Sequence, residues 1–159
     1  MARTAVVASK PSPAPYLLDV NVLIALAWPL HVHHVIAHAW FERVGQQSWS
    51  TCPLTQLAFV RISSNAKIIS TAVSPRAAVQ ALGDMVALAG HVFWADDLAV
   101  NDLTSFTSNA LEGHRQVTDA YLIELAKRHK GKVATLDAGL ADLLPQVERA
   151  KYVAFIGAA

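Results

Sequence analysis

The chain has 159 residues, which is enough for one domain with a sizeable hydrophobic core. Hydrophobic residues make up 53% of it and charged residues 16%, so the composition excludes an intrinsically disordered protein. Its single cysteine, Cys52, excludes an intramolecular disulfide and a cysteine-rich zinc site. The formal net charge of +1 neither supports nor excludes a nucleic-acid partner.

The beginning of the chain is rich in proline. We expect residues 1–15 to form an extension and residues 16–159 to form a single domain. The apolar patch after Arg3 is too small for the core of a signal peptide, and no stretch is long and apolar enough to cross a bilayer as a helix. We therefore expect a cytoplasmic protein without a membrane partner.

Strands and helices are predicted to alternate along the chain. Short apolar runs predict strands over 16–18, 49–52, 92–95, 132–136 and 152–156. Apolar spacing and end signals predict helices over 20–28, 31–44, 54–64, 76–88, 98–106, 117–129 and 139–144, with a polar loop over 107–113. This alternation is typical of an α/β fold in which helices cover both faces of a mainly parallel sheet.

The spacing of apolar residues also predicts which helix faces pack inward. In the helix over 31–44, the predicted core-facing residues are Val32, Ile36, Ala39, Trp40 and Val44. In the helix over 54–64, they are Leu57, Ala58 and Ile62.

Three aspartates are placed so that they could converge. Asp19 and Asp137 end predicted strands, and Asp119 lies in the first turn of the helix over 117–129. Parallel strands bring their carboxyl ends to one edge of a sheet. Clustered carboxylates repel one another and favour an oxygen-seeking cation such as Mg²⁺ or Mn²⁺. Each aspartate also has a simpler interpretation, as a helix cap or a turn residue.

Four segments in order resemble the PIN-domain ribonucleases, specifically toxins of the VapC type. They are LLDVNVLI at 17–24, TCPLTQLAFVR at 51–61, VTDAYL at 117–122 and ATLD at 134–137. Together they span essentially all of the chain after residue 15. The resemblance implies an α/β/α sandwich around a parallel sheet. It also implies an endoribonuclease that requires Mg²⁺ or Mn²⁺, forms a homodimer and is neutralised by a small antitoxin protein.

The resemblance assigns roles to individual residues. Asp19 and Asp119 match the principal metal ligands of the family, and Asp137 matches the acidic residue that completes the metal site directly or through water. These three residues are the expected catalytic set. Asn21 and Thr118 match supporting polar positions.

One position departs from the family pattern. Gln56 stands where the family often has a glutamate, and an amide carries no charge. We therefore expect weaker metal binding, or one ion in place of two. The same departure keeps a second hypothesis open, in which the protein is a catalytically weak PIN-like module that binds RNA or a protein partner.

Several basic residues have two open interpretations. Arg61 could hold an RNA phosphate or pair with a structural carboxylate, and Arg115 could contact substrate or form a surface salt bridge. The His31–His38 cluster has the spacing of metal ligands, although the polar face of a surface helix also accounts for it. The basic run over 127–132 either complements a helix dipole or attracts an RNA backbone.

Overall fold

A computed structural model describes residues 13–103 and 111–157. Most of the proline-rich segment predicted over 1–15 lies outside these ranges. So do the end of the helix predicted over 98–106 and the start of the loop predicted over 107–113. No helix in the described ranges combines the length and apolar character that crossing a bilayer requires.

The centre of the fold is a parallel sheet. Its five strands in the described residues are β1 (Tyr16–Leu18), β2 (Trp49–Thr51), β3 (His91–Phe93), β4 (Lys132–Thr135) and β5 (Val153–Phe155). Their order is β3-β2-β1-β4-β5, and every neighbouring pair is parallel. The predicted parallel sheet is therefore confirmed, with β1 in the middle and its carboxyl end flanked by the ends of β2 and β4.

Helices connect the strands. The α-helices are α1 (Val20–Ala27), α2 (His34–Arg43), α3 (Pro53–Ser63), α4 (Pro75–Val86), α6 (Gln116–Arg128) and α7 (Gln146–Tyr152). Short 3₁₀ helices are η1 (Gly45–Gln47), η2 (Val100–Asp102) and η3 (Ala138–Leu143). The sequence pattern did not predict α7. It predicted a helix over 98–106, but the described part of that range contains only the 3₁₀ helix η2.

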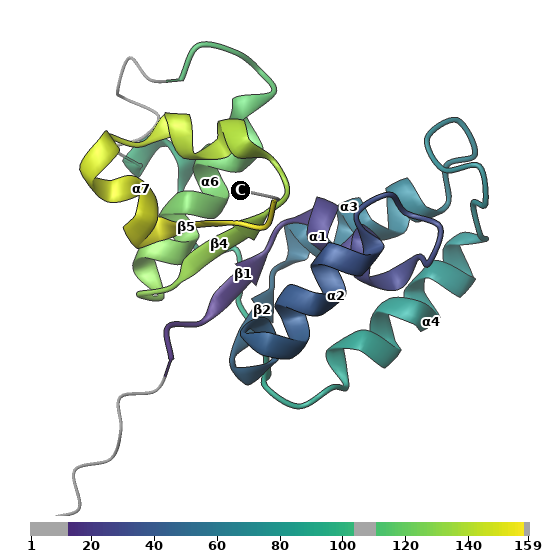
Figure 1. The fold of residues 1–159 in the computed structure, drawn as a ribbon. Helices are drawn as coiled ribbons and strands as arrows, with labels where there is room; N and C mark the ends of the chain where they lie inside the picture. The colour runs from purple at the N-terminus through teal and green to yellow at the C-terminus, as the bar shows by residue number, and fades with distance from the viewer. Residues whose placement is uncertain (1–12, 104–110, 158–159) are drawn as a thin grey trace, which may run out of the picture.

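The helices form a layer on each side of the sheet. Figure 1 shows α6 and α7 on one side of the strands and α1 to α4 on the other. Leu17 packs into a core with Leu122 and Leu125 of α6, whereas Leu18 packs into a second core with Leu23 and Phe59 of α1 and α3. Successive residues of a strand point to opposite faces, so β1 supplies both cores. This arrangement confirms the α/β/α sandwich.

The predicted inward face of α2 is correct for Trp40 and Ile36, which pack into the core, and wrong for Val32 and Ala39, which are exposed. Its buried residues are Ala37, Trp40 and Phe41, whereas Val32 is 87% exposed. The histidine cluster explains the rotation of the helix. The ring of His34 donates to the backbone oxygen of Ala25 at 2.8 Å.

The ring of His38 makes a similar bond, since it donates to the backbone oxygen of Leu26 at 2.9 Å. Both histidines of α2 therefore donate to the end of α1. Carbonyls at the end of a helix have no partner within the helix, and these rings supply partners to the end of α1. The polar face of α2 therefore lies against α1, which accounts for His34 and His38 without a metal.

The predicted inward face of α3 is correct for Ile62, which packs against the core, and wrong for Leu57. Leu57 is 70% exposed, and the buried positions are Thr55, Phe59 and Ser63. Trp28, after the end of α1, stacks on Phe59 with ring centroids 6.2 Å apart and donates from its indole nitrogen to the hydroxyl of Ser63 at 2.9 Å. This contact selects the buried face of α3.

Candidate active site

Asp19 lies at the carboxyl end of the central strand. Its backbone nitrogen continues the strand ladder by donating to the oxygen of Ala134 at 2.9 Å. Its side chain caps α1 by accepting from the backbone nitrogen of Val20 at 2.7 Å. The residue is only 7% exposed, so the fold holds a carboxylate at the point where β1 turns into α1.

Two neighbouring side chains hold the other oxygen of Asp19. Asn21 donates to Oδ2 at 2.9 Å, and the hydroxyl of Thr135 donates to the same atom at 2.8 Å. Asn21 also donates to Thr135 at 3.1 Å and accepts from the backbone nitrogen of Leu136 at 3.1 Å. The network joins the ends of β1 and β4 and fixes the orientation of the Asp19 carboxylate.

Thr135 was not singled out from the sequence, although it lies in the ATLD segment. A polar residue inside an apolar strand, two positions before an aspartate, was the available signal. Its hydroxyl also accepts from the backbone nitrogen of Asp137 at 3.0 Å, so it orients the turn that follows β4.

Asp119 and Asp137 complete an acidic cluster around Asp19. Asp119 is half-buried in the first turn of α6, and no side chain or backbone group over 13–103 and 111–157 donates to it. Asp137 is exposed and accepts from the backbone nitrogen of Gly139 at 2.8 Å. The structure therefore brings the three predicted aspartates to one edge of the sheet.

Two carboxyl groups of the cluster, those of Asp19 and Asp119, have raised pKa values. Burial, followed by the charges of Asp19 and Asp137, raises the pKa of Asp119 from 3.8 to about 6. Burial also raises the pKa of Asp19, although its bonds from Thr135 and Val20 lower it in part. A site that raises the pKa of two carboxyl groups in this way favours a bound cation.

The chemistry of these side chains fits Mg²⁺ or Mn²⁺, because all the available ligands are carboxylate oxygens. Their spacing is looser than a complete metal cage. In the described part of the chain, no three His, Cys, Asp or Glu side chains lie close enough together to hold one ion.

Gln56 and Thr118, the other two polar positions singled out from the sequence, lie in α3 and in the first turn of α6. The amide of Gln56 donates to the hydroxyl of Thr51 at 2.9 Å, and that hydroxyl is hydrogen-bonded to His91 at 2.8 Å. Thr118 is exposed and lines a neighbouring cavity. Within the described residues, neither one hydrogen-bonds to the aspartates, so the network around Asp19 depends on Asn21 and its partner in β4.

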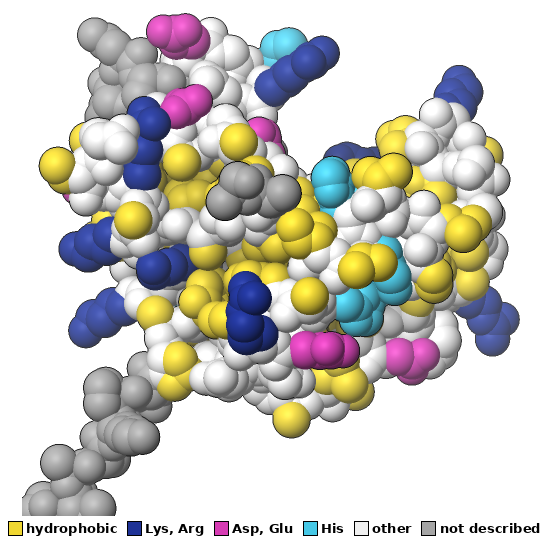
Figure 2. Space-filling model, viewed as in Figure 1, with side chains coloured by type: hydrophobic (Ala, Val, Ile, Leu, Met, Phe, Trp, Pro, Cys, Tyr) yellow, Lys and Arg dark blue, Asp and Glu magenta, His cyan; other side chains and the backbone are white. Residues whose placement is uncertain are grey.

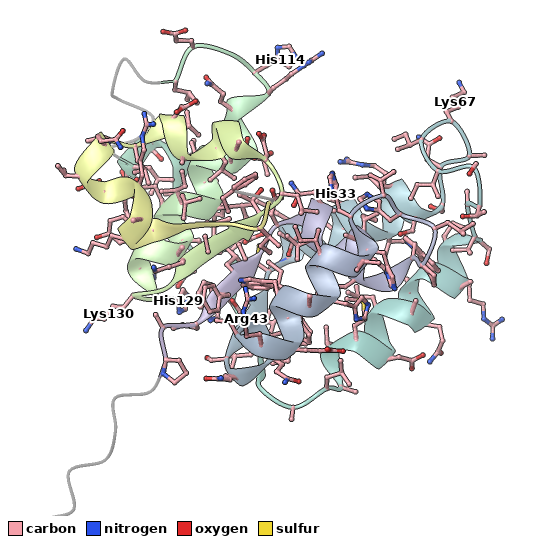
Figure 3. All side chains as sticks on the ribbon, viewed as in Figure 1. His33, Arg43, Lys67, His114, His129 and Lys130 are labelled. Carbon is pink, nitrogen blue, oxygen red and sulfur yellow. The ribbon has the colours of Figure 1, made fainter. Side chains whose placement is uncertain are left out.

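The two arginines singled out from the sequence are exposed. Arg61 lies in the last turn of α3, and Arg115 immediately precedes α6. Neither forms an ion pair with any residue over 13–103 and 111–157, so the structural salt bridges considered for them are not observed in this part of the chain. Figure 3 shows His114, next to Arg115, and Lys67 projecting outward from the loops before α6 and α4.

The basic run over 127–132 lies at the other end of α6. Figure 3 shows Lys130 at the end of α6 that is remote from His114. Arg128 pairs with Asp97 at 3.0 Å, and Lys127 lies within 3.4 Å of Glu124. On the face shown in Figure 2, the lysine and arginine side chains of the described residues are scattered among apolar and neutral ones and form no continuous basic surface.

Comparison with known proteins identifies the family. No family model matches the chain. Ribonuclease VapC39 of Mycobacterium tuberculosis strain H37Rv is 47% identical over 126 residues, which cover 79% of this chain and 91% of the relative. Ribonuclease VapC38 of the same strain is 42% identical over 130 residues, which cover 82% and 90%. Ribonuclease VapC29 is 41% identical over 127 residues, which cover 80% and 89%. With such identity over most of each chain, and with a parallel α/β/α fold, the chain belongs to the VapC family of PIN-domain ribonucleases.

Proposed function

We propose that this protein is the toxin of a VapBC-type toxin–antitoxin pair and an endoribonuclease that requires Mg²⁺ or Mn²⁺. Its relatives carry the name of ribonucleases, which supports the reaction class. The observation that carries the proposal is the acidic cluster at the carboxyl edge of the sheet, in which burial, with a smaller contribution from neighbouring carboxylate charges, raises the pKa values of Asp19 and Asp119. Such a cluster suits a divalent cation and a phosphodiester substrate.

In this proposal Asp19, Asp119 and Asp137 hold the cation, with Asp137 acting directly or through water. The bound ion would polarise a phosphodiester oxygen and lower the pKa of a nearby water. Asn21 and Thr135 keep the Asp19 carboxylate in one orientation through bonds of 2.9 and 2.8 Å. The pKa of Asp119 is raised to about 6 mainly by burial, so in the metal-free protein this carboxyl group is mostly ionised only above that pH.

The reaction we propose is hydrolysis without a covalent enzyme intermediate. A water oxygen forms a bond to phosphorus while the bond from phosphorus to the ribose 3′ oxygen breaks. The attacking water gives up a proton to solvent, and the departing 3′ oxygen takes up a proton from solvent, so the products are a 5′-phosphate and a 3′-hydroxyl. Arg61 and Arg115 are exposed, and we assign them contacts with RNA phosphates.

We further propose a domain over 16–159 with an extension over 1–15, a homodimer and a cytoplasmic location. A small antitoxin protein is the proposed regulatory partner. These proposals rest on membership of the family.

A second candidate function is a PIN-like module that binds RNA or a protein partner with little catalysis. Gln56 favours it, because this residue adds no negative charge to the cluster and its amide is engaged by Thr51. The loose spacing of acidic residues in the described part of the chain favours it as well.

Cleavage of RNA by purified protein, free of antitoxin, separates the two functions. The reaction contains Mg²⁺ or Mn²⁺, with EDTA in a parallel sample. Asp19→Asn keeps the size of the side chain and removes its charge, and Asp84→Asn on the exposed side of α4 is the matched control. We expect metal-dependent cleavage by the wild type and the control only. Absence of both cleavage and metal binding would contradict the nuclease proposal.

A further inference from the structure

A cavity of about 350 Å³ adjoins the acidic cluster. It lies between the start of α3, the segment after β3 and the first turn of α6. Its walls include Leu54, Asp96, Leu98, Val117, Thr118 and Tyr121. Thr118 directly precedes Asp119, and successive helical side chains are rotated by about 100°. The first turn of α6 therefore presents Asp119 to the acidic cluster and Thr118 to the cavity.

The carboxylate of Asp96 is held at the wall of this cavity. Its Oδ2 accepts from the backbone nitrogen of Leu54 at 3.1 Å, at the start of α3. Asp96 also contributes to the raised pKa of the Cys52 thiol, which burial mainly brings to about 11, so that the thiol keeps its proton at neutral pH. Asp96 is exposed and forms no ion pair within residues 13–103 and 111–157. The backbone nitrogen of Leu54 thus holds an acceptor that lines the cavity.

The opposite wall supplies hydrogen-bond donors. The hydroxyl oxygen of Tyr121 accepts from the backbone nitrogen of Leu98 at 3.4 Å, and its hydrogen has no acceptor among the described residues. Thr118 adds an exposed hydroxyl. Leu54, Leu98 and Val117 make the rest of the wall largely apolar. An apolar slot with a fixed acceptor and a few donors has the features of a pocket for one flat, polar-edged ring.

We propose that this cavity binds a guanine base of the RNA substrate beside the scissile phosphate, with Asp96 as the residue that selects it. The proposal rests on the proposed ribonuclease function. Guanine presents two adjacent donors, N1–H and the N2 amino group, next to the acceptor O6. A carboxylate can accept from both donors while a hydroxyl donates to O6.

The other bases match this pattern less well. Adenine and cytosine each present one amino donor next to a ring acceptor. Uracil presents one donor between two carbonyl oxygens, which a carboxylate repels. The aliphatic side chains of Leu54 and Val117 would pack on the faces of the ring, which every base shares, so the selection depends on Asp96.

Nucleotide binding to the full chain, without metal, tests the pocket independently of catalysis. The probes are the four ribonucleoside 5′-monophosphates, which share one phosphate and differ in the base. We expect GMP to bind the wild type most tightly. Asp96→Asn keeps an oxygen for the backbone nitrogen of Leu54 but presents amide donors to the base, so the preference for GMP should fall by roughly tenfold or more.

Asp97→Asn is the matched control. It removes the same charge one residue away, from a carboxylate that pairs with Arg128 at 3.0 Å and does not line the cavity. This variant should retain the preference for GMP. If Asp96→Asn proves unstable on melting, Val117→Phe narrows the cavity without removing a hydrogen bond and should also weaken GMP binding.

Sequencing the ends produced from a randomised RNA connects the pocket to cleavage. We expect guanine to be enriched at one fixed position beside the cut for the wild type and for Asp97→Asn, and the enrichment to be lost for Asp96→Asn. Equal binding of the four nucleotides, or equal losses in both variants, would overturn the pocket. Selective GMP binding without cleavage would support the guanine pocket and contradict the ribonuclease function. Cleavage without a guanine preference would support the ribonuclease function and contradict the guanine pocket.

Discussion

Asp119→Asn should stabilise the metal-free protein while removing its activity. Burial and two neighbouring charges raise the pKa of Asp119 from 3.8 to about 6, so its ionised form is disfavoured in the folded state. A difference of about two pH units corresponds to about 3 kcal/mol for a fully shielded group. Because Asp119 is only half-buried, solvent screening reduces this to about 1–2 kcal/mol.

The sign of the effect depends on pH. A carboxyl group whose pKa is raised by folding lowers stability as the pH rises from 3.8 to about 6, and the full cost is present above that range. The asparagine variant carries no such cost. Its melting temperature at pH 7.5 should exceed that of the wild type by about 3–6 °C, and the difference should disappear as the pH falls towards 4.

Thermal unfolding of metal-free protein from pH 4 to pH 8 measures this difference. Asp84→Asn, an exposed change on α4, controls for the loss of one charge. Added Mg²⁺ should raise the melting temperature of the wild type and leave that of Asp119→Asn unchanged, because only the wild type binds the ion. The raised pKa of Asp119 would be refuted if the variant melted below the wild type at pH 7.5. It would also be refuted if the two melting temperatures differed by the same margin at pH 4 and at pH 8.

Three further substitutions test the surroundings of the cluster. Thr135→Val removes the buried hydroxyl that donates to Asp19 at 2.8 Å and should cost about 1–3 kcal/mol in denaturant unfolding, with normal stability contradicting a role for this bond. Gln56→Glu replaces the donor to Thr51 with a charge and should tighten Mn²⁺ binding in calorimetry by about tenfold, whereas unchanged affinity would separate this position from the metal site. Gly45→Ala would place a Cβ 2.6 Å from an indole ring atom, so melting should show a loss of about 1–3 kcal/mol, and wild-type stability would show that the ring can move aside.

The sequence predicts the sheet and the position of the aspartates because both depend on local patterns. A short apolar run followed by an aspartate predicts a buried strand, and the parallel connections then bring Asp19 and Asp137 to one edge. The supporting group Thr135 could not be singled out in the same way. Its role depends on a contact with Asp19 across 116 positions of the chain, which no local pattern records.

The helix faces show a second limit of sequence patterns. In α2, apolar residues and histidines are interleaved, so more than one rotation of the helix buries an apolar stripe. The choice is made by His34 and His38, which donate to the last carbonyls of α1 at 2.8 and 2.9 Å. Those partners come from another helix, so the rotation of α2 depends on tertiary structure. The helix α7 was missed for a related reason, since none of its residues is buried.

The acidic cluster combines one fixed carboxylate with two less constrained ones. Asp19 accepts three hydrogen bonds that join α1, β1 and β4, so it cannot turn away without breaking contacts in the sheet. Asp119 accepts none from the described residues, and Asp137 accepts one from Gly139. In the proposed function, a cation would meet Asp19 as a preformed ligand at the sheet, and the other two carboxylates would have to move towards it. This asymmetry explains how the described residues can lack a complete metal cage while still concentrating negative charge at one place.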